Sequence, residues 1–228
     1  QSAWNKLDLL KRDQYLAYGT ALATNAGGVP PSHFSSLNAP IYAGATQTFA
    51  QTETDWQDEM FRAAPISQLQ ASLSGSTEKS KMYLSFGRFS QDGFMLGTAY
   101  DRYNGRLGIE TNVGKRITIG ENAQLTQSNN YNQVQSGGRT MIMHMLRSVP
   151  YIPVHNPTNN GGYAGTTSAD GSDPENPVRL ANMDKREGHT VDILSNTFVQ
   201  AKIVEGLKYK FTFGVNYNVF RGQQNDPI

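Results

Sequence analysis

The segment Asn104-Gly-Arg-Leu-Gly-Ile-Glu-Thr-Asn-Val113, followed by Gly-Lys-Arg and then Ile117-Thr-Ile-Gly-Glu-Asn-Ala-Gln-Leu-Thr126, decides the fold class. In both runs apolar or small residues alternate with polar ones, and a period of two residues is that of a β-strand with one apolar and one polar face. The polar positions hold Arg, Glu and amide side chains rather than short solubilising ones. The two runs therefore predict a hairpin from the wall of a large barrel that is apolar outside and wet inside.

Composition limits the class of protein. The chain has 228 residues, no Cys, a formal net charge of +1 and a mean hydropathy of −0.53. This length suffices for one all-β domain or two smaller ones. A near-neutral charge argues against a nucleic-acid partner, which would favour a basic face. No apolar run reaches the about 20 residues of a membrane helix, whereas barrel strands of roughly 10 alternating residues keep the mean hydropathy low.

Further alternation predicts strands on both sides of the hairpin. One pair is centred on residues 69–73 and 82–86, and the last pair covers 191–203 and 207–219, with Lys208 and Lys210 on the polar face. Tight connections at 75–81, 114–116 and 205–206 alternate with long ones at 8–65, 91–102 and 133–189. This alternation is typical of an outer-membrane barrel with short periplasmic turns and long extracellular loops. Residues 8–65 and 133–189 are accordingly predicted as the first and second long extracellular loops.

Local signals predict two short helices in the first long connection. The first would be capped by Asp8 or Asp13 and end near Asn25, and the second would be capped by Thr54 or Asp55. Residues 1–7 resemble the end of a strand, and 29–54 an ordered surface loop.

Glu121 is a misfit on the apolar face. We attribute its place there to a position near the membrane interface or to a β-bulge in that strand.

Alternation alone does not separate a membrane barrel from a soluble β-sandwich, since both have strands with one apolar and one polar face. Long amide-rich strands favour the barrel. A secreted glycan-binding β-sandwich and a structural barrel component of a larger envelope complex stay open as alternatives. An enzyme is not expected, because the chain has four His, no Cys and neither a His-Glu-x-x-His nor a Gly-x-Ser-x-Gly motif.

Several segments resemble the SusC/RagA-type TonB-linked outer-membrane proteins. They are Thr54-Asp-Trp-Gln-Asp-Glu-Met-Phe61, Ser72-Leu-Ser-Gly-Ser-Thr-Glu-Lys-Ser80, Tyr100-Asp-Arg-Tyr-Asn104 and Pro150-Tyr-Ile-Pro-Val-His-Asn156. The resemblance covers nearly the whole chain, and the motifs occur in the order of the family. Proteins of this family are far longer, with an N-terminal plug, a TonB-contacting segment and a 22-stranded barrel. Residues 1–228 are therefore expected to be the N-terminal portion of the barrel domain, without the plug.

The resemblance implies a function in nutrient uptake. It implies TonB-dependent import of oligosaccharides or peptides across the bacterial outer membrane. The implied partners are a SusD-like surface lipoprotein that acts as a lid, TonB, and outer-membrane lipid. No catalytic residue, cofactor, metal or nucleic acid is implied.

The candidate substrate-binding residues are Tyr151, His155, Asn156 and Tyr163, because aromatic and polar side chains in a long loop can stack on and hydrogen-bond a polar ligand. Packing within the loop is the alternative role for each.

Two charged groups have structural interpretations. The carboxylates of residues 170–176 lack the ligand spacing of a calcium loop and predict a solvated turn rather than a metal site. Arg106 and Glu110 share the polar face of one strand, and we expect them to pair and stabilise the wall, with ligand binding as the alternative role.

Overall fold

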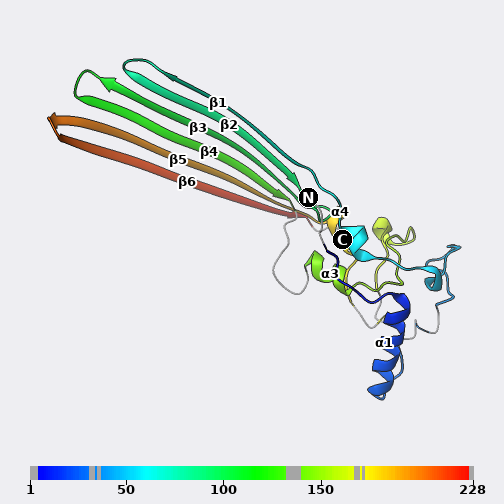
Figure 1. Cartoon of the computed structure of the whole chain (residues 1–228). Coiled ribbons are helices and arrows are strands. Elements are labelled where there is room, and N and C mark those ends of the chain that lie inside the picture. The colour runs from blue at the N-terminus through cyan, green and yellow to red at the C-terminus, as the bar shows by residue number, and fades with distance from the viewer. Residues whose placement is uncertain are drawn as a thin grey trace.

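The computed structural model describes residues 5–30, 34, 37–131, 140–166, 170 and 173–225. It has two parts (Figure 1): a sheet of long strands and, at one end of the sheet, a cluster of loops and short helices. We call the second part the loop cluster; it comprises the described residues of 5–65 and 140–184. Within the described ranges, none of the helices has the length and apolar character needed to cross a membrane.

The sheet is an antiparallel meander of six strands in the order β1-β2-β3-β4-β5-β6, so each strand pairs with the next along the chain. The strands are β1 (Ile66–Ser76), β2 (Ser80–Asp92), β3 (Ala99–Val113), β4 (Ile117–Tyr131), β5 (Lys185–Val204) and β6 (Leu207–Asn225). β5 and β6, with 20 and 19 residues, are longer than the roughly 10 residues that a tilted strand needs to cross a bilayer. The sheet therefore extends beyond the thickness of a membrane.

The register keeps the apolar positions of all strands on one face. One row across this face, from β1 to β6, contains Leu73, Leu84, Leu107, Ala123, Ser195 and Val215. The neighbouring row on the other face contains Ser72, Ser85, Arg106, Gln124, Leu194 and Asn216. With the exception of a few residues such as Leu194, the two faces are apolar and polar as the alternation predicts.

The apolar face has no protein partner among the described residues. Leu73 is 62% exposed and Phe211 57%, and the described strands form one sheet rather than two stacked ones. In a β-sandwich these side chains would be buried against a second sheet. An exposed apolar face of this size needs a hydrocarbon partner, as the outer surface of a membrane barrel has.

The two ends of the sheet differ in the length of their connections. The tight turns after β1, β3 and β5 lie at the end remote from the loop cluster (Figure 1), and Gly114 and Gly206 adopt positive φ angles of 71° and 83° there. The long connections lie at the other end. β5 begins at Lys185, so residues 185–189 belong to a strand although the sequence pattern assigned them to a loop.

The N-terminal segment differs from the expectation. The described residues 5–11 form no strand, and α1 (Arg12–Asn25) begins after Lys11 rather than at Asp8 or Asp13. The reason is local: the Gln14 side chain accepts a hydrogen bond of 3.0 Å from the Lys11 backbone N–H. The second cap is confirmed, because Asp55 Oδ1 accepts bonds from the backbone N–H groups of Gln57 and Asp58 at the start of α2 (Trp56–Met60).

Glu121 lies in a regular strand, so the predicted β-bulge is wrong. The pairing of β4 with both neighbours is continuous, and the register shift among the described strands is in β5, between Lys202 and Val204. The Glu121 carboxylate accepts hydrogen bonds from Ser195, at 2.7 Å, and from Thr197, both of which lie on the same face of β5. Two hydroxyl donors thus accommodate this carboxylate on the apolar face.

Glycines on the polar face make room for side chains of the neighbouring strand. Gly87 lies opposite Asn104, and Gly120 lies opposite Phe198. A Cβ atom at Gly120 would lie 2.2 Å from Cε1 of the Phe198 ring. This close approach explains why a residue without a side chain stands in the middle of a strand, where glycine is otherwise unfavourable.

Replacing Gly120 by alanine is expected to destabilise the sheet by about 1–3 kcal/mol, since the new methyl group overlaps the Phe198 ring. The measurement is urea unfolding, in detergent, of the whole protein that contains this chain. Adding Phe198→Ala should recover part of the loss. Gly105→Ala is the matched control, because no atom lies within 4 Å of its added Cβ. Equal effects of the two glycine substitutions would contradict the packing argument.

Candidate functional site

The loop cluster has a hydrophobic core of its own, centred on Tyr151. Tyr151 is fully buried, and the rings of Tyr15, Phe34 and Phe49 meet it edge-on at centroid distances of 6.2, 6.2 and 6.3 Å. Segments that are far apart in the sequence therefore converge on one side chain. The structure assigns Tyr151 to packing, the alternative role, since a ligand has no access to it.

The hydroxyl group of Tyr151 donates a hydrogen bond of 2.8 Å to Oδ1 of Asp170, whose residue is 2% exposed. Burial, and then the neighbouring Asp170 carboxylate, raise the pKa of the Tyr151 phenol, so it remains a neutral donor. Asp170 is thus part of the core, and the prediction of a solvated turn is wrong at this residue.

Hydrogen bonds fasten the two long connections to each other. Trp56 Nε1 donates to the Val149 carbonyl at 3.0 Å. The Thr54 backbone N–H and hydroxyl donate, at 2.7 Å each, to the carbonyls of Pro150 and Ile152. Because these bonds join residues more than 90 positions apart, the two predicted loops form one packed unit.

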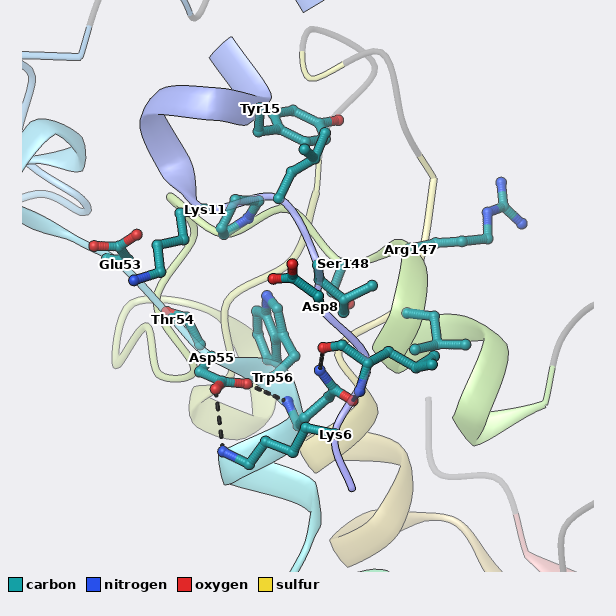
Figure 2. Close-up of a pocket in the computed structure, with 16 residues that line it drawn as sticks. Lys6, Asp8, Lys11, Tyr15, Glu53, Thr54, Asp55, Trp56, Arg147 and Ser148 are labelled. Atoms are coloured by element: carbon teal, nitrogen blue, oxygen red, sulfur yellow. Dashed lines mark hydrogen bonds and ion pairs between the residues drawn. The ribbon is translucent and has the colours of Figure 1, made fainter. Parts of the chain in front are cut away.

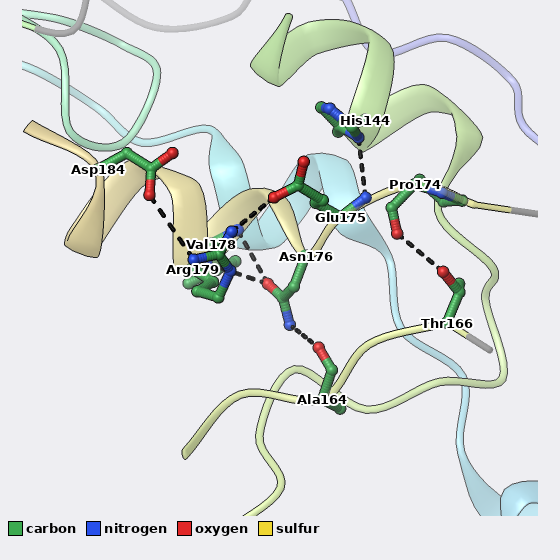
Figure 3. A network of polar contacts seen from close by, with 9 residues as sticks. All are labelled: His144, Ala164, Thr166, Pro174, Glu175, Asn176, Val178, Arg179 and Asp184. Carbon is green, nitrogen blue, oxygen red and sulfur yellow. Dashed lines mark hydrogen bonds and ion pairs between the residues drawn. The ribbon is translucent and has the colours of Figure 1, made fainter. Parts of the chain in front are cut away.

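A polar network at the start of α4 (Pro177–Met183) supports this unit (Figure 3). Asn176 caps the helix through Oδ1, and its Nδ2 donates to the carbonyls of Val154 and Ala164, at 2.8 Å each. His144 of α3 (Met141–Arg147) accepts a bond of 2.9 Å at Nδ1 from the Glu175 backbone N–H. The network therefore holds the chain segments around residues 154 and 164 in place.

Three candidate residues lie between those two segments, in a short hairpin. His155 and Tyr163 form a β-bridge, and their rings are 5.2 Å apart with an interplanar angle of 35°. The Tyr163 hydroxyl accepts a bond of 3.1 Å from Asn182 of α4. Asn156 instead holds the turn, because its Oδ1 accepts bonds from the backbone N–H and hydroxyl of Thr158. The hairpin thus presents an aromatic pair, in which His155 is exposed and Tyr163 partly exposed.

A second feature of the loop cluster is a hollow of about 660 Å³ (Figure 2), beside residues 6–11. Gln57 holds this segment as a neighbouring strand would: its side chain accepts a bond of 2.9 Å from the Leu7 N–H and donates one of 2.8 Å to the Leu7 carbonyl. Lys6 pairs with Asp55, at 3.2 Å, and with Asp58. The hollow is lined by leucines and by side chains of both charge signs, so its lining does not favour one ligand charge.

Asp55 makes the attachment of this segment dependent on pH. Burial alone would raise the pKa of Asp55, but the Asp58 and Gln57 backbone N–H groups and the Lys6 side chain stabilise the carboxylate, and the net pKa is lowered. A lowered folded-state pKa contributes stability that is present above the unfolded-state pKa, about 4, and is lost as the pH falls through the folded-state value.

We therefore expect hydrogen-exchange protection of the Leu7 and Asp58 amides, corrected for intrinsic rates, to fall below about pH 4. Asp55→Asn keeps a side chain that caps helices well but cannot be protonated in this range. It should flatten this pH dependence. An unchanged pH profile in Asp55→Asn would contradict the assignment to Asp55.

The polar face of the sheet contains the third feature, a hollow of about 500 Å³. Its polar lining residues come from β1 to β5 and include Gln68, Gln70, Ser85, Arg102, Asn104, Arg106, Gln124, Thr126 and Asp192. Arg106 and Glu110 form no ion pair with each other in the described structure, so the predicted wall-stabilising pair is absent. The sequence pattern placed Arg106 on this face, but only the strand register brings it into a hollow with Arg102 and the amides.

These features define a class of protein. A single exposed apolar face, a polar and hollowed opposite face, and connections that alternate in length define the wall of an outer-membrane β-barrel. No family model matches the chain.

Sequence relatives of the chain indicate which kind of outer-membrane barrel it resembles. The chain is 28% identical to TonB-dependent receptor P3 of Formosa agariphila over 218 residues, which are 92% of this chain and 19% of that receptor. It is 25% identical to TonB-dependent receptor P39 of the same organism over 178 residues, which are 78% of this chain and 16% of that receptor. The chain thus spans less than a fifth of the length of these curated relatives.

Solved structures show the same fold. The RagAB peptide transporter matches with a TM-score of 0.71 and 21% identity, over 98% of this chain and 27% of that one. The RagAB peptide importer in its open-open state matches with a TM-score of 0.66 and 21% identity, over 99% of this chain and 28% of that one.

Together these similarities confirm the resemblance to SusC/RagA-type TonB-linked outer-membrane proteins and the prediction of an antiparallel barrel segment. They also confirm the bacterial outer membrane as the location. The relatives are receptors rather than enzymes, as predicted.

Proposed function

We propose that this chain forms part of the wall and outer loops of a TonB-dependent importer of oligosaccharides or peptides. The observation that carries the proposal is the two-faced sheet, which exposes an apolar face to lipid and a polar, hollowed face to a lumen. A lumen lined by amides, hydroxyls and charges hydrogen-bonds a polar oligomer as it passes. The names of the relatives support TonB as the energy source, because these relatives are TonB-dependent receptors.

The loop cluster supports a role in capture at the outer surface. It packs as one unit at the end of the sheet that carries the long connections (Figure 1), which is the extracellular end in outer-membrane barrels. The aromatic pair His155–Tyr163 provides a stacking surface for a sugar ring or an apolar side chain. We assign to the same surface the contact with a SusD-like lipoprotein lid.

The test is uptake of labelled oligosaccharides and peptides by cells that carry the full-length receptor in their outer membrane. Uptake is expected with an active TonB system and is expected to stop when TonB is deleted. The double variant His155→Ala/Tyr163→Ala should reduce uptake while surface expression stays unchanged. Tyr18→Ala is the matched control, because it removes an exposed aromatic side chain from α1, elsewhere in the loop cluster. Uptake that does not depend on TonB, or no uptake of either class, would favour a structural barrel component instead.

A further inference from the structure

The polar face of the sheet has an excess of positive charge. It carries seven cationic residues against two anionic ones, counted over the polar-face positions of the paired strands. The cationic residues are Lys81, Arg102, Arg106, Arg186, Lys202, Lys208 and Lys210, and the anionic ones are Glu110 and Asp192. Because the whole chain is near neutral, with a formal charge of +1, this excess belongs to the face and not to the overall composition.

Two of these cations, Arg102 and Arg106, line the hollow of about 500 Å³. Both are exposed, and neither forms an ion pair within the residues that the structure describes. The guanidinium of Arg102 lies over the Phe89 ring, 5.7 Å from its centroid, which holds the cation without neutralising it.

The neighbours of these arginines leave space and supply further hydrogen-bonding groups. Ser85 lies opposite Arg106, and Gly87 lies opposite Asn104, between the two arginines. The amides of Gln68, Gln70 and Gln124 line the same hollow. Small residues beneath and amides around two unpaired guanidinium groups are suited to a ligand that carries negative charge and further polar groups.

The two carboxylates of this face do not remove the charge. Asp192 lines the same hollow from β5, two strands away from Arg106, and accepts a hydrogen bond from Asn218 on the far side. Glu110 lies four positions along β3 from Arg106, a separation of about 13 Å at the rise of a strand. Asp192 is thus the one carboxylate among the described residues that line the hollow, and the two arginines Arg102 and Arg106 leave the lining with a net positive charge.

We propose that Arg102 and Arg106 form a lumenal subsite for the carboxylate groups of an acidic oligomer. This inference rests on the proposed function and names the charge class of the substrate. Each planar guanidinium donates two parallel hydrogen bonds to one carboxylate. Arg102 and Arg106 are four residues apart on one strand, about 13 Å, so the subsite favours an oligomer that carries more than one carboxylate over a single acid.

The experiment measures equilibrium binding to the purified full-length receptor in detergent by calorimetry. The acidic probes are tetraglutamate and trigalacturonate, which present carboxylates on a peptide and on a sugar; the neutral probes are tetraglutamine and maltotriose. At least one acidic probe should bind roughly 10-fold or more tightly than its neutral match, and less tightly as salt is added. The probe that shows the preference identifies the source of the carboxylate.

The double variant Arg102→Gln/Arg106→Gln should remove this preference, whereas Arg106→Lys should retain part of it. Arg221→Gln is the matched control. Arg221 is an exposed arginine on the opposite face of the sheet, where it lies opposite His189, and it is not among the residues that line the hollow. Heat-dependent gel mobility checks that each variant is folded.

The outcomes separate this inference from the proposed function. Equal binding of acidic and neutral probes would overturn the subsite, and so would a preference that survives in the double variant. If another segment of the receptor fills the hollow, the acidic and neutral probes bind equally, and this result also overturns the subsite. Such a result leaves TonB-dependent uptake of neutral oligomers intact. Conversely, binding of the probes to the purified receptor needs no energised partner. A lack of uptake by cells would therefore contradict the proposed function, while the preference for acidic probes could still be measured.

Discussion

Replacing Tyr151 by alanine is expected to lower the stability of the loop cluster by about 3–5 kcal/mol, the cost of deleting a large buried aromatic side chain. The ring is fully buried and meets Tyr15, Phe34 and Phe49 edge-on. Its removal leaves a cavity where three chain segments converge and ends the hydrogen bond to Asp170. The loss should be confined to the loop cluster, since Tyr151 makes none of the strand pairings.

Amide hydrogen exchange of the full-length receptor measures this effect. Protection should fall at Thr54 and Ile152, whose amides donate to backbone carbonyls inside the cluster, and should persist in β3 and β4. Tyr151→Phe is the matched control: it keeps the ring and loses only the bond to Asp170, so the expected cost is about 1–3 kcal/mol. Exchange that is unchanged in Tyr151→Ala would show that this side chain is not the centre of the core.

Replacing Val215 by arginine is expected to destabilise the barrel by about 2–4 kcal/mol, the cost of an arginine that faces lipid at mid-depth. Val215 lies in the apolar row of Leu107 and Leu84, near the middle of the outward positions of β6. The neighbouring substitution, Asn216→Arg, places the same side chain on the lumenal face, where water hydrates it, and should cost little.

Both positions are exposed on one strand, so the comparison tests the direction of the face alone. The measurement is urea unfolding of the full-length receptor in lipid vesicles. Lipid has to be present, because the difference in stability between the two variants arises from contact of the apolar face with hydrocarbon. A larger loss for Asn216→Arg than for Val215→Arg would reverse the assignment of the two faces and end the barrel interpretation.

The sheet could be predicted from the sequence in most respects. Alternation with a period of two residues is a local property, so the strands, their faces and the tight turns at 114–116 and 205–206 follow from the chain itself. Strand ends were less accurate, as the start of β5 at Lys185 shows, because polar residues near a strand end resemble a loop. The Glu121 misfit was recognised from the pattern, but its explanation needed the register, which brings Ser195 and Thr197 beside it.

The loops and the lumenal hollow depended on the tertiary structure. Tyr151 and Tyr163 are the same residue type in the same long connection, yet one is fully buried and the other partly exposed. That difference depends on Trp56 bonding to Val149 and on Asn176 fastening two distant segments. The sequence by itself determined which faces meet lipid and water, because a strand's side chains alternate wherever it lies. Only the folded chain decided which residues share a core or a hollow, because those contacts arise between segments that no local period relates.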